Sequence, residues 1–269
     1  MIHIATVHHK NSFWIDIQLK YLKKFIKDNF KTYTVIDTEP GINVWDKKYN
    51  GIEESLINKF DFVYQNVPGS HQKRLKFLYK KILASEDVKA NDLLIFIDSD
   101  AFPISNQVIP FVKQKLKIFP LIAVRRDENC GDLMPHPCFC ATTIRFWRLL
   151  DNEFPSINLW GYGPNLSVTH PTNEIGGVLG SKLKEKFIEW YPILRSNKIN
   201  YHEVFFGIYG DIIYHHGGGS RAIRCRNDFV KYGGMKNYDN SDRYQKIQAI
   251  DENLIQEIQY NDNFFTKFI

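Results

Sequence analysis

Cysteine is scarce in this sequence, and long apolar runs are absent. The four cysteines among 269 residues do not have the spacing of a disulfide framework, so we expect a reducing, cytoplasmic location. No apolar stretch approaches the roughly 20 residues of a membrane-spanning helix, and no basic leader opens the chain. We therefore expect at most a peripheral association with a membrane, at its inner face.

A strong excess of one charge is also lacking. The chain has 35 Lys and Arg against 30 Asp and Glu, a net charge of +5. This modest excess favours anionic ligands weakly and does not indicate a nucleic-acid partner. Hydrophobic residues make up 43% of the chain, which is enough to bury a sizeable α/β core. We find no internal repeat, no low-complexity linker and no clear domain boundary.

The most informative segment runs from Leu93 to Ile104 and reads L-L-I-F-I-D-S-D-A-F-P-I. Its short apolar run predicts a strand that is buried on both faces of a sheet. Asp98 and Asp100 then lie at the carboxyl end of this strand, where open α/β sheets bind ligands. Two carboxylates two residues apart can face one small volume and hold a divalent cation such as Mg²⁺ or Mn²⁺. Such an ion suits the oxygen atoms of a phosphate.

Strands and helices alternate through the first half. An apolar stripe from Ile15 to Phe30 predicts the first helix, and Ser70 can cap a second helix that runs to Ile82. This alternation predicts an α/β fold with a mixed, mostly parallel sheet flanked by helices. The predicted strands are Ile2–Val7, Tyr33–Asp37, Asp61–Gln65, Leu93–Asp98 and Leu121–Arg125.

The second half is less regular. Residues 127–180 are rich in Pro, Gly, Asn and Cys, as in loops that line a site. Within and after them we expect a strand at Cys138–Thr142, a helix at Thr143–Leu150 and a strand at Ile212–His215. A further helix is expected with its apolar face inward, formed by Leu183, Phe187, Trp190 and Leu194.

A zinc site is one interpretation of the cysteines. Cys130, His136, Cys138 and Cys140 lie close in sequence, but the one-residue gap between the last two is not a usual zinc spacing. We favour a structural role for these residues.

The chain resembles nucleotide-sugar-dependent glycosyltransferases of the GT-A fold. The resemblance is carried by the opening strand Ile4-Ala5-Thr6-Val7-His8-His9, by the apolar strand into Asp98-Ser99-Asp100, by the irregular region after it and by a late histidine. It implies one Rossmann-like GT-A domain over residues 1–269, with a nucleotide-sugar-binding half at 1–126 and an acceptor-binding half at 127–269. It also implies transfer of a sugar to a glycan or lipid-linked acceptor, as in polysaccharide biosynthesis.

The same resemblance implies roles for individual residues. Asp100 would bind Mn²⁺ or Mg²⁺, and Asp98 would contact the ribose or bind the metal through water. The metal would bridge the phosphates of a UDP or GDP sugar and stabilise the departing diphosphate. The remaining residues expected at the donor or the metal are Thr6, His8, Asp37, Lys73, Ser99, His215 and Arg221.

Two of these assignments stay open. Asp37 is read equally well as a contact to a base edge or as a turn residue. Adjacent side chains on a strand point opposite ways, so only one of His215 and His216 can reach the metal, and we choose His215. Three glycines and Arg221 follow them, which suits a phosphate.

An inverting transfer needs a base to take the proton of the acceptor hydroxyl. The sequence offers Glu174 and Asp132 as the leading candidates, with His136 and Asp211 beside them. A retaining enzyme needs no such base, and the sequence does not decide between the two outcomes.

Two other functions fit parts of the sequence. A non-catalytic subunit that binds a nucleotide sugar or a glycan would keep the fold, although it has no need of both aspartates and the late histidine. A phosphohydrolase of the HAD type also places D-x-D after a buried strand. Its motif usually lies near the amino terminus and is followed by Gly-Thr, whereas Ala101-Phe102-Pro103 follows here.

Overall fold

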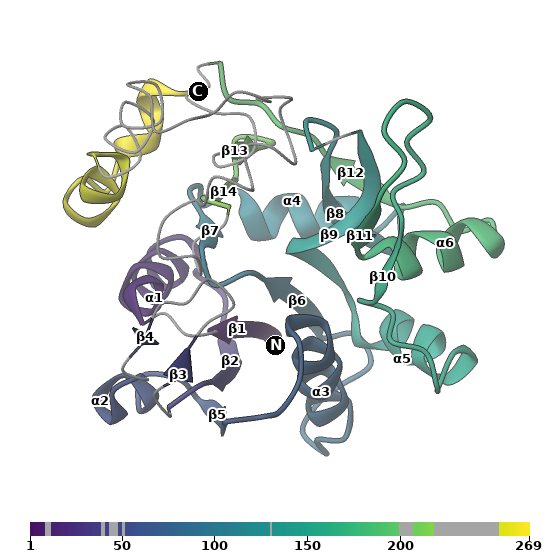
Figure 1. The fold of residues 1–269 in the computed structure, drawn as a ribbon, viewed down its shortest axis with the longest axis horizontal. Helices are drawn as coiled ribbons and strands as arrows, with labels where there is room; N and C mark the ends of the chain where they lie inside the picture. Colours follow the sequence, from purple (N-terminus) through teal and green to yellow (C-terminus); the bar gives the residue numbers. More distant parts are fainter. Residues whose placement is uncertain are drawn as a thin grey trace.

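The computed structural model describes residues 1–8, 12–38, 41–42, 48–49, 52–129, 131–198, 207–217 and 253–269. Its centre is a seven-stranded sheet in the order β12-β8-β9-β6-β1-β2-β5 (Figure 1). All neighbouring strands are parallel except β9, which runs antiparallel to both β6 and β8. The expected mixed, mostly parallel α/β sheet is therefore confirmed. The strands are β1 (Ile2–His8), β2 (Phe30–Ile36), β5 (Phe62–Gln65), β6 (Leu93–Ile97), β8 (Leu121–Arg126), β9 (Asp132–Thr143) and β12 (Tyr191–Ile193).

Helices cover both faces of this sheet (Figure 1). The apolar side chains of β6 explain this arrangement, because they alternate between two cores. Ile95 packs with α1 and α4 on one face, whereas Leu94 and Phe96 pack with α3, α5 and α6 on the other. The helices are α1 (Phe13–Phe25), α2 (Glu54–Ile57), α3 (His71–Leu83), α4 (Val108–Lys115), α5 (Ile144–Glu153) and α6 (Gly177–Glu185).

A small antiparallel sheet leaves the main sheet at the carboxyl end of β6. It has the order β13-β14-β7 and pairs Ala101 with His215. A third core lies behind it, where Phe102 and Tyr214 pack against α1 and the carboxyl-terminal segment. The remaining strands and the 3-10 helix are β3 (Gly41–Ile42), β4 (Lys48–Tyr49), β7 (Ala101–Pro103), β10 (Tyr162–Pro164), β11 (Asn173–Ile175), β13 (Gly207–Tyr209), β14 (Ile213–His215) and η1 (Phe264–Lys267).

The helix expected through residues 183–194 is wrong in its second half. The helix α6 ends at Glu185, and Phe187 takes a left-handed conformation with φ 54° and is 95% exposed. The Ile188 amide donates to the Leu183 carbonyl, which closes the helix in a Schellman turn. The next residues form β12 at the edge of the sheet, because Tyr191–Ile193 pair in parallel with β8.

Two other sequence expectations also need correction. Phe30 does not continue the stripe of the first helix but begins β2, four residues after Ile26 ends α1. Residues 127–180 are more regular than expected, since they contain the twelve residues of β9, the helix α5 and the hairpin of β10 and β11.

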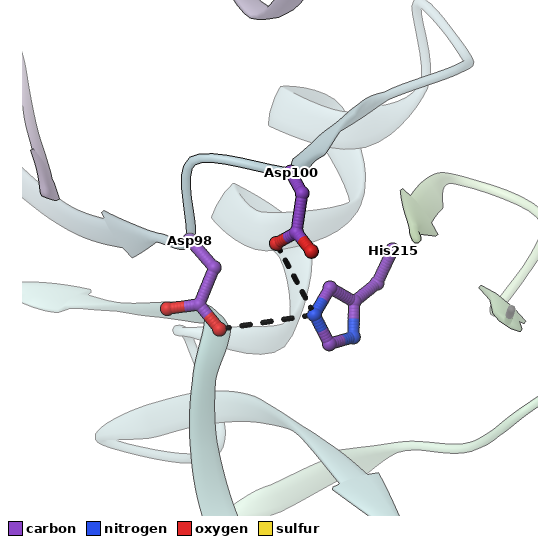
Figure 2. A group of neighbouring side chains, drawn as sticks. All are labelled: Asp98, Asp100 and His215. Carbon is purple, nitrogen blue, oxygen red and sulfur yellow. Dashed lines mark ion pairs between the residues drawn. The ribbon is translucent and has the colours of Figure 1, made fainter. Parts of the chain in front are cut away.

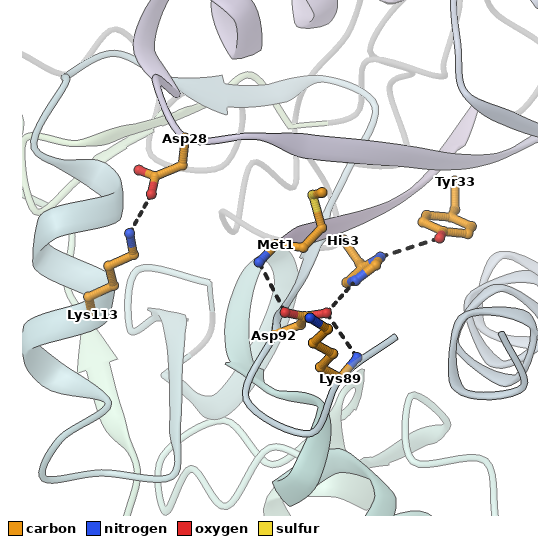
Figure 3. A network of polar contacts seen from close by, with 7 residues as sticks. All are labelled: Met1, His3, Asp28, Tyr33, Lys89, Asp92 and Lys113. Carbon is orange, nitrogen blue, oxygen red and sulfur yellow. Dashed lines mark hydrogen bonds and ion pairs between the residues drawn. The ribbon is translucent and has the colours of Figure 1, made fainter. Parts of the chain in front are cut away.

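The amino edge of the sheet is held by a polar network on the side away from Asp98 (Figure 3). The Asp92 carboxylate accepts from the Lys89 amide at 2.9 Å and contacts His3 Nε2 at 3.2 Å. The other ring nitrogen of His3 lies 3.3 Å from the Tyr33 hydroxyl. These contacts join β1, β2 and the segment before β6, so they fix the strand order that brings β6 to the centre.

Candidate metal and phosphate site

Asp98 and Asp100 lie in the tight turn between β6 and β7. The Ala101 amide donates to the Asp98 carbonyl at 3.0 Å and closes this turn. Because β7 pairs with β14, His215 stands opposite Ala101 and faces the same volume as the two carboxylates. Residues that are more than 110 positions apart in sequence are thus brought together by one strand pairing.

Figure 2 shows these three side chains converging. His215 Nε2 lies 3.5 Å from Asp100 Oδ1 and 3.8 Å from Asp98 Oδ2. One ligand atom of each residue lies within 4.8 Å of the other two, and Asp100 and His215 are buried. Two carboxylates and one imidazole are the donor set of a hard or borderline divalent cation, so the residues fit Mn²⁺ and Mg²⁺. We call Asp98, Asp100 and His215 the metal triad.

His216 points away from the metal triad, as alternation along a strand requires. Its Nδ1 lies 2.8 Å from the Tyr214 hydroxyl, and its ring centroid is 4.7 Å from that of Trp14. His216 therefore packs against α1.

The turn of the metal triad is clamped from behind by Gln18 of α1. Gln18 Nε2 donates to the carbonyl oxygens of Asp98 and Ala101 at 2.6 and 2.9 Å. Its Oε1 accepts from Thr6 Oγ1 at 3.2 Å and lies 3.2 Å from His8 Nε2. Gln18 is fully buried. One side-chain amide thus binds both ends of the turn that carries the aspartates.

Thr6 and His8, which were expected at the nucleotide, lie inside the core of the structure. Both side chains are fully buried and both contact Gln18. Burial lowers the pKa of His8 to about 4, so the ring is neutral at physiological pH. These residues support the clamp and do not line an open surface.

We predict that Gln18→Leu weakens Mn²⁺ binding by about 10- to 100-fold, as loss of a partner behind a metal ligand does. It also leaves two carbonyl oxygens without this donor and lowers the free energy of unfolding by about 1–3 kcal/mol. Calorimetric titration with Mn²⁺ and thermal unfolding measure the two effects. Asp16→Asn, an exposed change on the same helix, is the matched control. Unchanged Mn²⁺ affinity in Gln18→Leu would show that the residue only stabilises the fold.

Asp37 is also not exposed to a ligand. It is buried at the end of β2, where Arg74 of α3 forms two contacts of 2.8 Å with its two carboxylate oxygens. A bidentate ion pair therefore occupies this carboxylate in the structure. Lys73, which precedes Arg74 in the sequence, is exposed and lies against Gly69.

His71 belongs to the site, although the sequence alone did not single it out. Its Nε2 lies 3.2 Å from Asp98 Oδ1, and its side chain is 31% exposed. It occupies the first turn of α3, where free amide groups and the helix dipole favour an anion. The only signal in the sequence was its place after the expected cap Ser70. Ser99, between the two aspartates, is partly buried in the turn.

Asp132 and Glu174 are brought together, but inside the protein. Asp132 begins β9 and is fully buried, and Glu174 on β11 is 5% exposed and accepts from Thr172 Oγ1 at 3.0 Å. Burial raises the pKa of Asp132 to about 7, against the opposing effect of Arg126, whose Nη2 lies 3.9 Å from Oδ2. The negative charge of Glu174 adds to this increase. Asp132 is therefore a carboxyl group that gains or loses its proton near neutral pH.

The other residues that the sequence suggested are placed as follows. Arg221 and Cys130 lie outside the described residues. Cys138 and Cys140 are buried free thiols whose pKa values burial raises, as in a structural role. Asp211 is exposed in the turn between β13 and β14.

Among the helices that the structure describes, none has both the length and the apolar character of a membrane span.

Several solved structures are similar to this chain. A mannosyltransferase from Pyrobaculum calidifontis, in complex with GDP-Man and Mn²⁺, has a TM-score of 0.45 at 8% identity, over 71% of this chain and 54% of that one. The galactosyltransferase LgtC, with donor and acceptor sugar analogs, has a TM-score of 0.34 at 10% identity, over 55% and 60%. A 4-diphosphocytidyl-2C-methyl-D-erythritol synthase from Anaerococcus prevotii has a TM-score of 0.42 at 9% identity, over 87% and 95%.

The chain spans about half the length of the mannosyltransferase and three fifths of LgtC. No protein-family model matches the sequence, and no curated protein matches it. These similarities are distant, and the function proposed for this chain rests on its own side chains.

Proposed function

We propose that this protein is a metal-dependent glycosyltransferase that moves a sugar from a nucleotide diphosphate sugar to a glycan or lipid-linked acceptor. The observation that supports this proposal is the metal triad at the carboxyl edge of the central sheet. Edges of this kind bind ligands in open α/β sheets. The composition of the triad suits an ion that binds phosphate oxygens. We place the reaction in the cytoplasm, with a lipid-linked acceptor reached at the inner face of a membrane.

In this proposal each residue near the triad has a distinct task. Asp100 and His215 would hold the cation, and Asp98 would complete the site directly or through water. The cation would stabilise the negative charge of the departing diphosphate. His71 and the free amides of α3 lie on the Asp98 side, where they bind phosphate oxygens. Gln18 keeps the two aspartates at a fixed separation.

Calorimetric titration with UDP and GDP, each with and without Mn²⁺, tests the proposal. We expect one nucleotide to bind with micromolar affinity in the presence of Mn²⁺ and much more weakly without it. If neither nucleotide binds under either condition, the glycosyltransferase proposal is wrong. Metal-dependent binding without any sugar transfer would favour the non-catalytic subunit.

A pH dependence follows if Asp132 takes the proton of the acceptor hydroxyl. A base acts in its ionised form, so transfer should rise as the pH passes through about 7. Asp132→Asn should lower the transfer rate by roughly 10²–10⁴-fold and remove this rise. Glu174→Gln should keep a rise, moved to lower pH, because it removes a negative charge that raises the pKa of Asp132. A wild-type rate that is independent of pH from 5 to 9 would contradict this role.

A further inference from the structure

His136 lies beside the metal triad but does not belong to it. It lies on β9, opposite Val124 of β8, and is 4% exposed. Its ring centroid is 5.9 Å from that of His215, with the ring planes tilted by 38°. The strand continues to Cys138, whose carbonyl accepts from the Asp98 amide at 3.4 Å. His136 therefore stands on the strand that borders the turn of the two aspartates.

The tautomer of His136 is fixed by its own strand. Its Nδ1 lies 3.0 Å from the Cys138 amide nitrogen and accepts the hydrogen bond of that amide. A ring nitrogen that accepts carries a lone pair, so the single proton of the neutral ring is on Nε2. The ring is thus a neutral donor.

The donor group of His136 is left for a ligand. Among the described residues, none accepts a hydrogen bond from its Nε2. This nitrogen is also not one of the buried side-chain atoms without a partner, so it is not completely enclosed. A neutral donor suits this position, because a charged imidazolium would be repelled by a cation held at the triad.

We propose that His136 donates its Nε2–H to a phosphate oxygen of the diphosphate that the metal triad holds. This inference rests on the proposed function, because it needs a diphosphate at the triad. It assigns the recognition of the ligand's oxyanion to the strand β9. Hydrogen bonding of this kind adds affinity for the anion without adding charge next to the metal.

Two substitutions separate the two nitrogens of the ring. In His136→Asn, the side-chain oxygen takes the place of Nδ1 and keeps an acceptor for the Cys138 amide, but no donor reaches the ligand. In His136→Gln, the side-chain amide reaches the place of Nε2 and keeps the donor. The ligand probe is inorganic pyrophosphate in the presence of Mn²⁺, because it carries no base and no sugar. UDP and GDP are titrated in parallel.

We expect His136→Asn to bind pyrophosphate roughly ten-fold or more weakly than the wild type, as for a lost hydrogen bond to a charged group. His136→Gln should stay within about three-fold of the wild type, and Mn²⁺ alone should bind all three proteins equally. Equal pyrophosphate affinity in His136→Asn and wild type would overturn the inference, and so would a wild type that binds no pyrophosphate. Binding of pyrophosphate through His136 without binding of UDP or GDP would instead contradict only the glycosyltransferase proposal.

A second measurement does not depend on any variant. Nitrogen-15 spectra of the histidine rings report which ring nitrogen carries the proton. We expect the Nε2–H form for His136 in the free protein, and a shift of its Nε2 resonance when pyrophosphate is added with diamagnetic Mg²⁺. An Nδ1–H form, or an Nε2 resonance that does not move at saturating pyrophosphate, would overturn the inference.

Discussion

Asp100→Asn should reduce Mn²⁺ affinity by about 100-fold or more and abolish sugar transfer. Loss of a residue that only supports a metal ligand already lowers metal affinity by about 10- to 100-fold. Asp100 is expected to contact the ion itself. Its carboxylate lies 3.5 Å from His215 Nε2 and is 8% exposed. Calorimetric titration with Mn²⁺ measures the affinity directly.

The fold should survive this substitution. Two carboxylates that face each other repel, and replacing one with a neutral amide relieves this repulsion in the absence of metal. Asp100→Asn should therefore unfold at the same or a higher temperature than the metal-free wild type. Asp28→Asn is the control, because Asp28 pairs with Lys113 at the opposite edge of the sheet (Figure 3). Wild-type Mn²⁺ affinity in Asp100→Asn would remove the basis for the metal triad.

Arg74→Ala should destabilise the protein by about 3–5 kcal/mol, because it removes the guanidinium group that both oxygens of the buried Asp37 carboxylate contact. Both side chains are 8% exposed, and their two contacts of 2.8 Å have the bidentate geometry of a strong pair. For a chain of this size the melting temperature should fall by roughly 10 °C. Thermal and urea unfolding of the metal-free protein give the change.

A double variant shows whether the loss of stability in Arg74→Ala comes from the buried charge of Asp37. Asp37→Leu with Arg74→Met replaces both groups with apolar side chains and should be less destabilised than Arg74→Ala alone. The exposed pair of Lys59 and Asp16 gives a reference, since Lys59→Ala should cost about 1 kcal/mol or less. A cost below about 1 kcal/mol for Arg74→Ala would contradict the structural role given to Asp37.

Local sequence patterns predicted the strands β1, β2, β5, β6 and β8 of the main sheet but not β12. The apolar run of β6 is the clearest case, because a strand that is buried on both faces is apolar at nearly every position. The strand β9 was only half predicted. Its first residues, Asp132 to Pro137, include two prolines and several polar side chains. They are extended because β8 pairs with them at Asp132 and His136, which is a long-range effect.

Residues of the candidate site were predictable only where they directly follow a buried strand in the sequence. Asp98 and Asp100 meet this condition, whereas the places of His71 and His136 depend on how α3 and β9 dock beside the turn. Thr6 and His8 show the opposite case. From the sequence, polar residues at the end of a buried strand are expected to line a cleft. Here Gln18 of α1 contacts them inside the core.

The central claim is that Asp98, Asp100 and His215 hold a divalent cation, and anomalous scattering from Mn²⁺ in crystals of the protein tests it most directly. Our account predicts one strong peak within about 2.5 Å of the Asp100 carboxylate and the His215 Nε2, and no such peak in Asp100→Asn. A wild-type crystal that is saturated with Mn²⁺ and shows no peak between these side chains would contradict the account.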